Sequence, residues 1–332
     1  MRVRIRLPDT AGRGWMRARH ESLYQPSICS EFGSSRWYNS ELMRTCWCIL
    51  LFWSFVAANS AAETNGYSPI AISNHLASVK AKAPRGFSVL WEPPFAIAGD
   101  ASDAVLRRVA TNTVRWATVR LRAEYFPRDP KPFIDIWLFG SDASYRHHAR
   151  VLFNDTPDTP FGYYSARNRA LIMNISTGGG TLIHEMVHAF MSANFEECPS
   201  WFNEGLASLY EQCGEENGRI HGYPNWRLPK LQEAIRDKKV PSFVKLTAMS
   251  SDEFYGRTTG AAYNQQYAQA RYLCYYLQER GLLGKFYREF HDHVRTDSTG
   301  YNSLRKVMGE TDMNAFQKKW ETFVLSLRVA DR

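Results

Sequence analysis

The chain has 332 residues, of which 44% are hydrophobic and 22% are charged, so its composition is that of a globular protein and excludes a largely disordered one. The net charge is +8, and half of it falls within residues 1–62, where eight arginines face four acidic residues. The remaining 270 residues carry only 8 − 4 = +4 and show no dense stripe of Lys and Arg, which argues against a nucleic-acid-binding protein.

The N-terminal residues predict export from the cytoplasm. Residues 1–42 are rich in arginine and lack helical or strand periodicity, so we expect them to be disordered. An apolar run of 13 residues at 46–58, flanked by Arg44 and by small residues at 59–62, is typical of a secretory signal peptide and falls short of the roughly 20 residues that span a bilayer. A translation start at Met43 would place this signal at the N-terminus.

The alternative for this segment is an uncleaved membrane anchor behind a cytoplasmic tail. Both interpretations place the body of the protein outside the cytoplasm, secreted or periplasmic. Any contact with a membrane would then be made through the N-terminal segment alone.

In the front half of the chain that follows residue 62, up to the motif described below, the sequence patterns predict a small mixed sheet with helices. Amphipathic spacing predicts a helix over 101–126, and the stretch 141–152 reads as another. Short apolar and alternating runs predict the strands, which are two within 86–98 broken at Pro93-Pro94, one at 133–139, and a hairpin of 162–165 with 169–175.

The back half is mostly helical by the same criteria. The expected helices are 230–237, 261–280, 283–294, 303–308 and 313–327. Pro241 and the polar stretch 249–260 mark loops. We find no internal repeat, so we expect a single α+β domain over 63–332, with a sheet-bearing front half and a helical back half.

The junction of the two halves holds a metal-ligand pattern, His184-Glu185-x-x-His188. Residues four apart lie on one face of a helix, so both imidazoles can aim at one point. A catalytic zinc ion takes three protein ligands and keeps a fourth position open to water. Glu185 would act as the general base, taking a proton from the attacking water and passing it to the leaving amine.

The third ligand is predicted to be Glu204. A metzincin would have Gly at 191 and His at 194, but this chain has Met191 and Asn194. Glu204 lies sixteen residues beyond His188, on a second helix expected to start near Pro199-Ser200. Gly205 beside it would let the two helices approach closely. The prediction is one zinc ion per chain, held by two histidines and one glutamate.

Two histidines on an apolar helix are also common as core residues with hydrogen-bonded rings, and a bare H-E-x-x-H is only suggestive. What favours a zinc site is the combination of a strand, a Gly turn, a buried helix with the motif, and a second helix carrying Glu204 within WFNEGLA.

The segments GGGTLIHEMVH and PSWFNEGLASLYE resemble the gluzincin branch of the H-E-x-x-H zinc metallopeptidases, the peptidase MA-like superfamily, and look closest to uncharacterised secreted bacterial members. The resemblance is specific over about 160–212 and looser over 262–327. It implies a zincin-like fold, zinc on His184, His188 and Glu204, Glu185 as the base, and a peptide or protein substrate. It also implies a sheet edge beside the cleft, for which 169–175 is the candidate strand.

Other candidate residues surround this core set. Gluzincins often hold the developing oxyanion with a Tyr or His, and Tyr263 and Tyr267 are candidates, of which we favour Tyr267. Ser208 and Asn203 can support a ligand histidine or simply lie on the helix surface.

The three cysteines of the body lie at positions 198, 213 and 274. A bridge between the first two would have to span the whole predicted helix, so any disulfide would join Cys274 to one of them. Buried reduced thiols are the alternative.

The main prediction is therefore an exported zinc metallohydrolase, most simply a peptidase. Two other classes stay open: a catalytically silent scaffold of the same fold, and a membrane-tethered interaction protein in which zinc is structural. An intact Glu185 argues against the first, and the open fourth position against the second.

Overall fold

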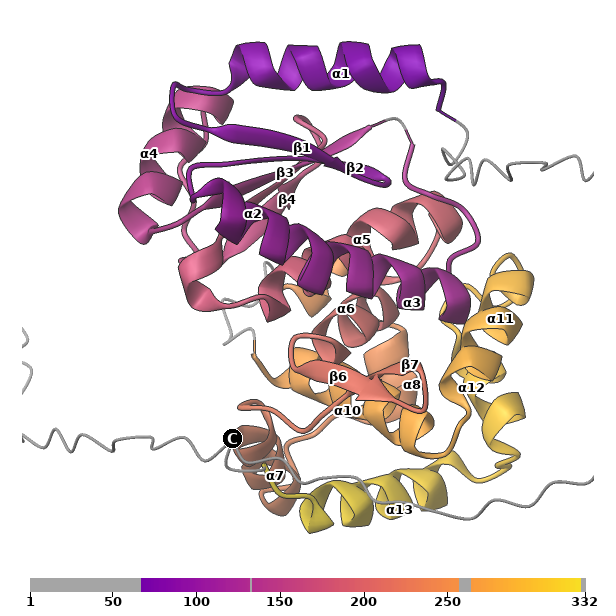
Figure 1. Cartoon of the computed structure of the whole chain (residues 1–332). Coiled ribbons are helices and arrows are strands. Elements are labelled where there is room, and N and C mark those ends of the chain that lie inside the picture. The colour runs from indigo at the N-terminus through magenta and orange to yellow at the C-terminus, as the bar shows by residue number, and fades with distance from the viewer. Residues whose placement is uncertain (1–66, 132, 257–263, 330–332) are drawn as a thin grey trace, which may run out of the picture. The chain divides into compact units, whose positions relative to one another are not determined.

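A five-stranded mixed sheet forms the front half of the protein (Figure 1). The computed structural model describes residues 67–131, 133–256 and 264–329, so the predictions for the N-terminal extension, the signal peptide and Tyr263 lie outside the described residues. In spatial order the strands are β1 (Ser88–Glu92), β2 (Phe95–Gly99), β3 (Ile134–Phe139), β5 (Ala170–Asn174) and β4 (Gly162–Ser165).

The central strands β2, β3 and β5 run parallel, and β1 and β4 pair antiparallel at the two edges. The expectation that 169–175 forms an edge strand is therefore wrong: β5 lies between β3 and β4, and the edge is β4. β5 is buried at every position, as a strand between two others and covered on both faces must be.

Helices cover both faces of this sheet (Figure 1). One face packs against α1 (Pro69–Lys82) and α4 (Asp142–Phe153), whose Val79 and Phe153 share a cluster with Trp137. The other packs against a long helix and against α5 (Gly180–Asn194). The long helix is predicted as one piece over 101–126, and the structure forms it as α2 (Asp103–Val109), the π-helical η1 (Ala110–Arg115) and α3 (Trp116–Glu124).

The back half is helical except for one hairpin. Its elements are α6 (Ser200–Leu209), β6 (Cys213–Glu216), β7 (Arg219–Gly222), α7 (Leu228–Arg236), α8 (Phe243–Thr247), α9 (Ser251–Phe254), α10 (Asn264–Glu279), α11 (Leu283–His293), α12 (Tyr301–Met308) and α13 (Met313–Ser326). One hydrophobic cluster runs from Ile97 in the sheet through Phe190 to Trp320 in α13, so both halves share a core. The architecture is α+β, as predicted.

Several helices and strands were not predicted from the sequence. Neither α1 nor the β6–β7 hairpin was expected, and α9 forms inside the stretch predicted as a loop over 249–260. Across the part of the chain that the structure describes, we find no helix with the length and apolarity needed to cross a bilayer.

Gly205 allows a close approach between two helices, but the pair is not the predicted one of α6 with α5. A Cβ added at this residue would lie 3.0 Å from the backbone oxygen of Ala270 and 3.1 Å from Sγ of Cys274, both in α10. The glycine therefore lets α6 approach α10, and not the histidine-bearing α5. Because α6 carries Glu204, this close packing fixes one wall of the predicted metal site against the back half.

The cysteines at 198, 213 and 274 are all free thiols, so the structure bears out the reduced alternative. Burial raises the pKa of the Cys213 thiol to about 12, because the charged thiolate is poorly solvated there.

Candidate metal site

The two motif histidines project from the same face of α5. The helix starts after Gly178, whose φ of 103° turns the chain from the short 3₁₀ helix η2 (Ile175–Thr177), and its apolar residues bury it against the sheet. His184 and His188 follow each other by one turn, and their Nε2 atoms lie 3.0 Å apart. The four-residue spacing thus brings both imidazoles to one point, as predicted.

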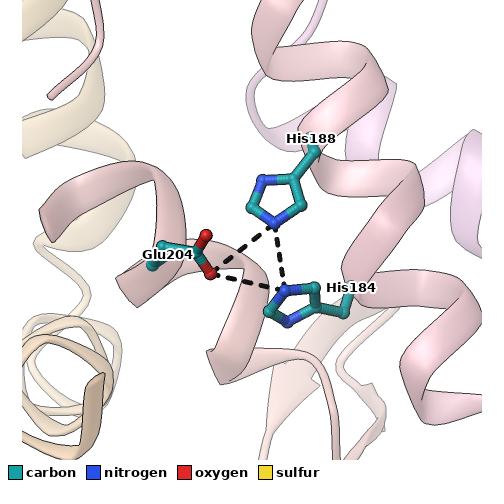
Figure 2. Close-up of side chains that lie close together, drawn as sticks. All are labelled: His184, His188 and Glu204. Atoms are coloured by element: carbon teal, nitrogen blue, oxygen red, sulfur yellow. Dashed lines mark hydrogen bonds and ion pairs between the residues drawn. The ribbon is translucent and has the colours of Figure 1, made fainter. Parts of the chain in front are cut away.

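Glu204 reaches the same point from the neighbouring helix α6 (Figure 2). Its Oε2 atom lies 3.4 Å from Nε2 of His184 and 3.6 Å from Nε2 of His188. The three candidate ligand atoms all lie within 4.8 Å of one another. The side chains predicted as metal ligands are therefore brought together from two helices that adjoin in sequence and in space.

The hydrogen bonds around this cluster suit a metal ion. Nδ1 of His188 lies 2.9 Å from Oδ1 of Asn203, an oxygen that accepts a hydrogen bond from an N–H at Nδ1, and this tautomer leaves the lone pair of the imidazole on Nε2. Oε2 of Glu204 is buried and has no hydrogen-bond partner. With Nε2 of both histidines unprotonated, three electron-pair donors face one point, and a zinc ion with nitrogen and oxygen ligands would supply the positive charge between them.

A proton is the alternative positive charge. Burial by itself disfavours a charged His188, yet the carboxylates of Glu204 and Glu185 outweigh it and raise the pKa of His188 to about 9. Burial likewise acts against the charge on Glu204, but the two histidines outweigh it, and the pKa of Glu204 lies well below its usual range. A proton and a metal ion therefore compete for the same point.

The second carboxylate oxygen of Glu204 is held by a residue that the sequence patterns missed. The hydroxyl of Tyr255 donates a hydrogen bond of 2.8 Å to Oε1 of Glu204. Tyr255 directly follows α9, in a stretch whose polar composition predicted only a loop, so no periodic pattern singled it out.

Glu211 is a second residue that the sequence patterns did not predict, and it lies near the ring nitrogen of His184 that faces away from the other ligands. Its Oε1 lies 3.5 Å from Nδ1 of His184. Arg227 donates two hydrogen bonds to this carboxylate, at 2.7 and 3.0 Å, and Asn225 donates a third at 3.2 Å. Three donors fix the carboxylate in place, so its negative charge stays directed toward the ring of His184.

Gly180, the first residue of α5, lies next to the turn that follows α6. A Cβ added to Gly180 would lie 1.9 Å from the backbone oxygen of Glu211. No side chain fits there, so the first residue of the histidine helix lies directly against the turn that follows the glutamate helix.

The remaining candidates lie nearby, in different surroundings. Glu185 is only 9% exposed, and its charge acts on His188. Tyr267 is buried, with its ring centroid 6.2 Å from that of Tyr255, and its assignment to the oxyanion stays a prediction. The hydroxyl of Ser208 donates to the backbone oxygen of Glu204 and not to a histidine, so this candidate supports the helix instead.

Comparison with known proteins places the site within one family model. A family described as "Protein of unknown function (DUF1570)" matches residues 179–300. A search of curated proteins gives no match. The matched stretch contains His184, Glu185, His188 and Glu204 and begins one residue before α5, so it covers the candidate site and leaves out the sheet.

Proposed function

We propose that the chain is a zinc-dependent metallohydrolase of the gluzincin type that cleaves peptide bonds. The observation that supports this most directly is the convergence of three donor atoms from α5 and α6, with Glu185 next to the first ligand. When bound there, zinc would lower the pKa of a water molecule and polarise a substrate carbonyl.

The chain's own residues would handle the proton. Glu185 is 9% exposed, and its negative charge helps to raise the pKa of His188, so the carboxylate acts on this ligand from a position largely shielded from bulk water. It would accept a proton from the attacking water and return it to the leaving amine. Asn203 holds His188 in the tautomer that leaves Nε2 free to bind, and Tyr255 fixes the carboxylate of Glu204.

The edge strand β4 supports a peptide as substrate, because it contacts the histidine helix α5 and offers unpaired backbone groups. The backbone N–H of Asn174 donates to the oxygen of Phe161, which sets the alternation of the antiparallel pairing. Gly162 and Tyr164 consequently direct their backbone groups away from β5. An extended peptide would add to this edge by main-chain hydrogen bonds.

The test compares wild type with Glu185→Gln and His184→Ala, all as the full chain. Zinc per chain is measured by elemental analysis, and hydrolysis is followed on a peptide library. Glu185→Gln should keep its zinc and lose about 10²–10⁴-fold in rate, the usual contribution of a general base. His184→Ala should lose the zinc itself. Zinc at 100 times its Kd should stabilise wild type by about 2.7 kcal/mol.

Glu197→Gln provides a matched control, because Glu197 is exposed in the connection between α5 and α6. This variant should keep both zinc and activity. Full activity in Glu185→Gln would refute the mechanism. A wild type that binds zinc but cleaves nothing would favour the silent scaffold.

A further inference from the structure

The two carboxylate oxygens of Glu204 have different surroundings, because only one of them contacts Tyr255. Oε1 accepts the hydrogen bond of the Tyr255 hydroxyl at 2.8 Å. Oε2 has no hydrogen-bond partner and lies 3.4 Å and 3.6 Å from the two imidazole Nε2 atoms. Only one oxygen of the carboxylate therefore faces the candidate metal position.

This division matters because a carboxylate can bind a metal through one oxygen or through both. With one oxygen from Glu204 and one nitrogen from each histidine, a zinc ion has three protein ligands and an open fourth position. If both oxygens of Glu204 turned to the metal, the second oxygen would be an additional ligand, which crowds the position that a water or substrate needs and raises the number of ligands to five when a water is bound. A group that holds Oε1 away from the metal would thus keep the site catalytic.

The structure fixes Tyr255 where it can hold Oε1. The preceding turn, α9, begins with a capping box in which Ser250 and Glu253 bond reciprocally. Hydroxyls of Ser251 and Ser200 lie 2.8 Å apart and tie α9 to the start of α6, the helix that carries Glu204. Phe254 is fully buried beneath. Tyr255 is therefore attached to the same helix as the ligand that it contacts.

A purely structural role is the competing explanation, since the ring of Tyr255 also packs beside Phe254 and Tyr267. That role would need the ring, but it would not need the hydroxyl to end on a ligand carboxylate. The hydroxyl of Tyr125 provides a comparison, because it forms an equally short buried contact, 2.8 Å from the hydroxyl of Tyr210, and none of the ligand side chains takes part in it.

We propose that Tyr255 is a positioning residue that reserves Oε1 of Glu204, restricts this ligand to one oxygen and so keeps one metal position open. The inference rests on the proposed function only in requiring that a metal binds between His184, His188 and Glu204. Tyr255 does not touch the substrate in this scheme and acts only through Glu204.

The test replaces zinc by cobalt(II) in wild type, Tyr255→Phe and Tyr125→Phe. Cobalt(II) takes the same ligands, and its visible absorption is strong when four ligands surround it and weak when there are five or six. Tyr255→Phe should lower this absorption as Glu204 turns both oxygens to the metal, and kcat/KM with zinc should fall about 10–100-fold. Tyr125→Phe should match wild type in both measurements.

The outcomes separate the two proposals. A Tyr255→Phe spectrum identical to that of wild type overturns the role of Tyr255 and leaves the metallohydrolase standing. A wild type that binds cobalt but hydrolyses no peptide overturns the enzyme, while the spectra still decide the role of Tyr255. A wild type that takes up neither metal overturns both.

Discussion

Replacing Glu211 by glutamine removes one negative charge from beside His184 and leaves the size of the side chain unchanged. In the structure this carboxylate accepts two hydrogen bonds from Arg227 and lies 3.5 Å from Nδ1 of His184. Glutamine keeps one acceptor oxygen, so the variant should lose about 1.5–3 kcal/mol of unfolding free energy, the typical value for a hydrogen bond to a charged group. Its zinc Kd should rise about 10–100-fold, because a supporting carboxylate orients a ligand histidine and strengthens it as a donor.

Glu92→Gln is the matched control for this loss. The Glu92 side chain is 5% exposed, against 9% for Glu211, and it accepts two hydrogen bonds from Arg115, at 2.7 and 2.6 Å, at the sheet edge formed by β1. Urea unfolding without metal measures stability, and competition with a chelator measures the zinc Kd. Both variants should lose stability, and only Glu211→Gln should lose zinc affinity. Equal zinc Kd values in the two variants would refute the role assigned to Glu211.

Two further predictions concern packing and thiol chemistry. Gly205→Ala should lower the unfolding free energy by about 1 kcal/mol, because overpacking against Ala270 costs about 1–3 kcal/mol and exceeds the gain in helix propensity. Gly284→Ala in α11 is the control and should be neutral or stabilising. Thermal unfolding of both variants tests this, and a Gly284→Ala variant less stable than Gly205→Ala would contradict it. Cys213 should resist iodoacetamide up to about pH 10 in the native protein, since burial raises the pKa of its thiol to about 12, and alkylation at pH 8 seen by mass spectrometry would contradict it.

The core of the candidate site follows from local patterns. The spacing of His184 and His188 suffices to place both rings on one helix face, since helix geometry fixes which residues share a face. Glu204 was predicted from its own helix start and its apolar neighbours, and the structure brings its Oε2 to the same point. Asn203, one of two supporting candidates, contacts His188.

The residues that support this core could not be predicted in the same way. Tyr255 and Glu211 lie in turns, where no periodicity exists, and they contact residues 51 and 27 positions earlier in the chain. The position of β5 inside the sheet, with β4 at the edge, depends on a pairing with β3 that crosses more than thirty residues. Such long-range pairings are set by tertiary packing, which a local reading of one sequence does not contain.

Gly180 lies against the backbone of Glu211, so the two ends of the stretch 180–211 meet and form a closed ring of chain that carries all three candidate ligands. In a zinc finger the metal has to organise the chain, and its binding energy is spent on folding. Here the packing of α5 and α6 in the folded protein already offsets the entropic cost of closing that ring, so metal binding does not have to. The stretch should therefore act as a preformed macrocyclic chelator, from which an ion can leave and to which it can return without the protein unfolding.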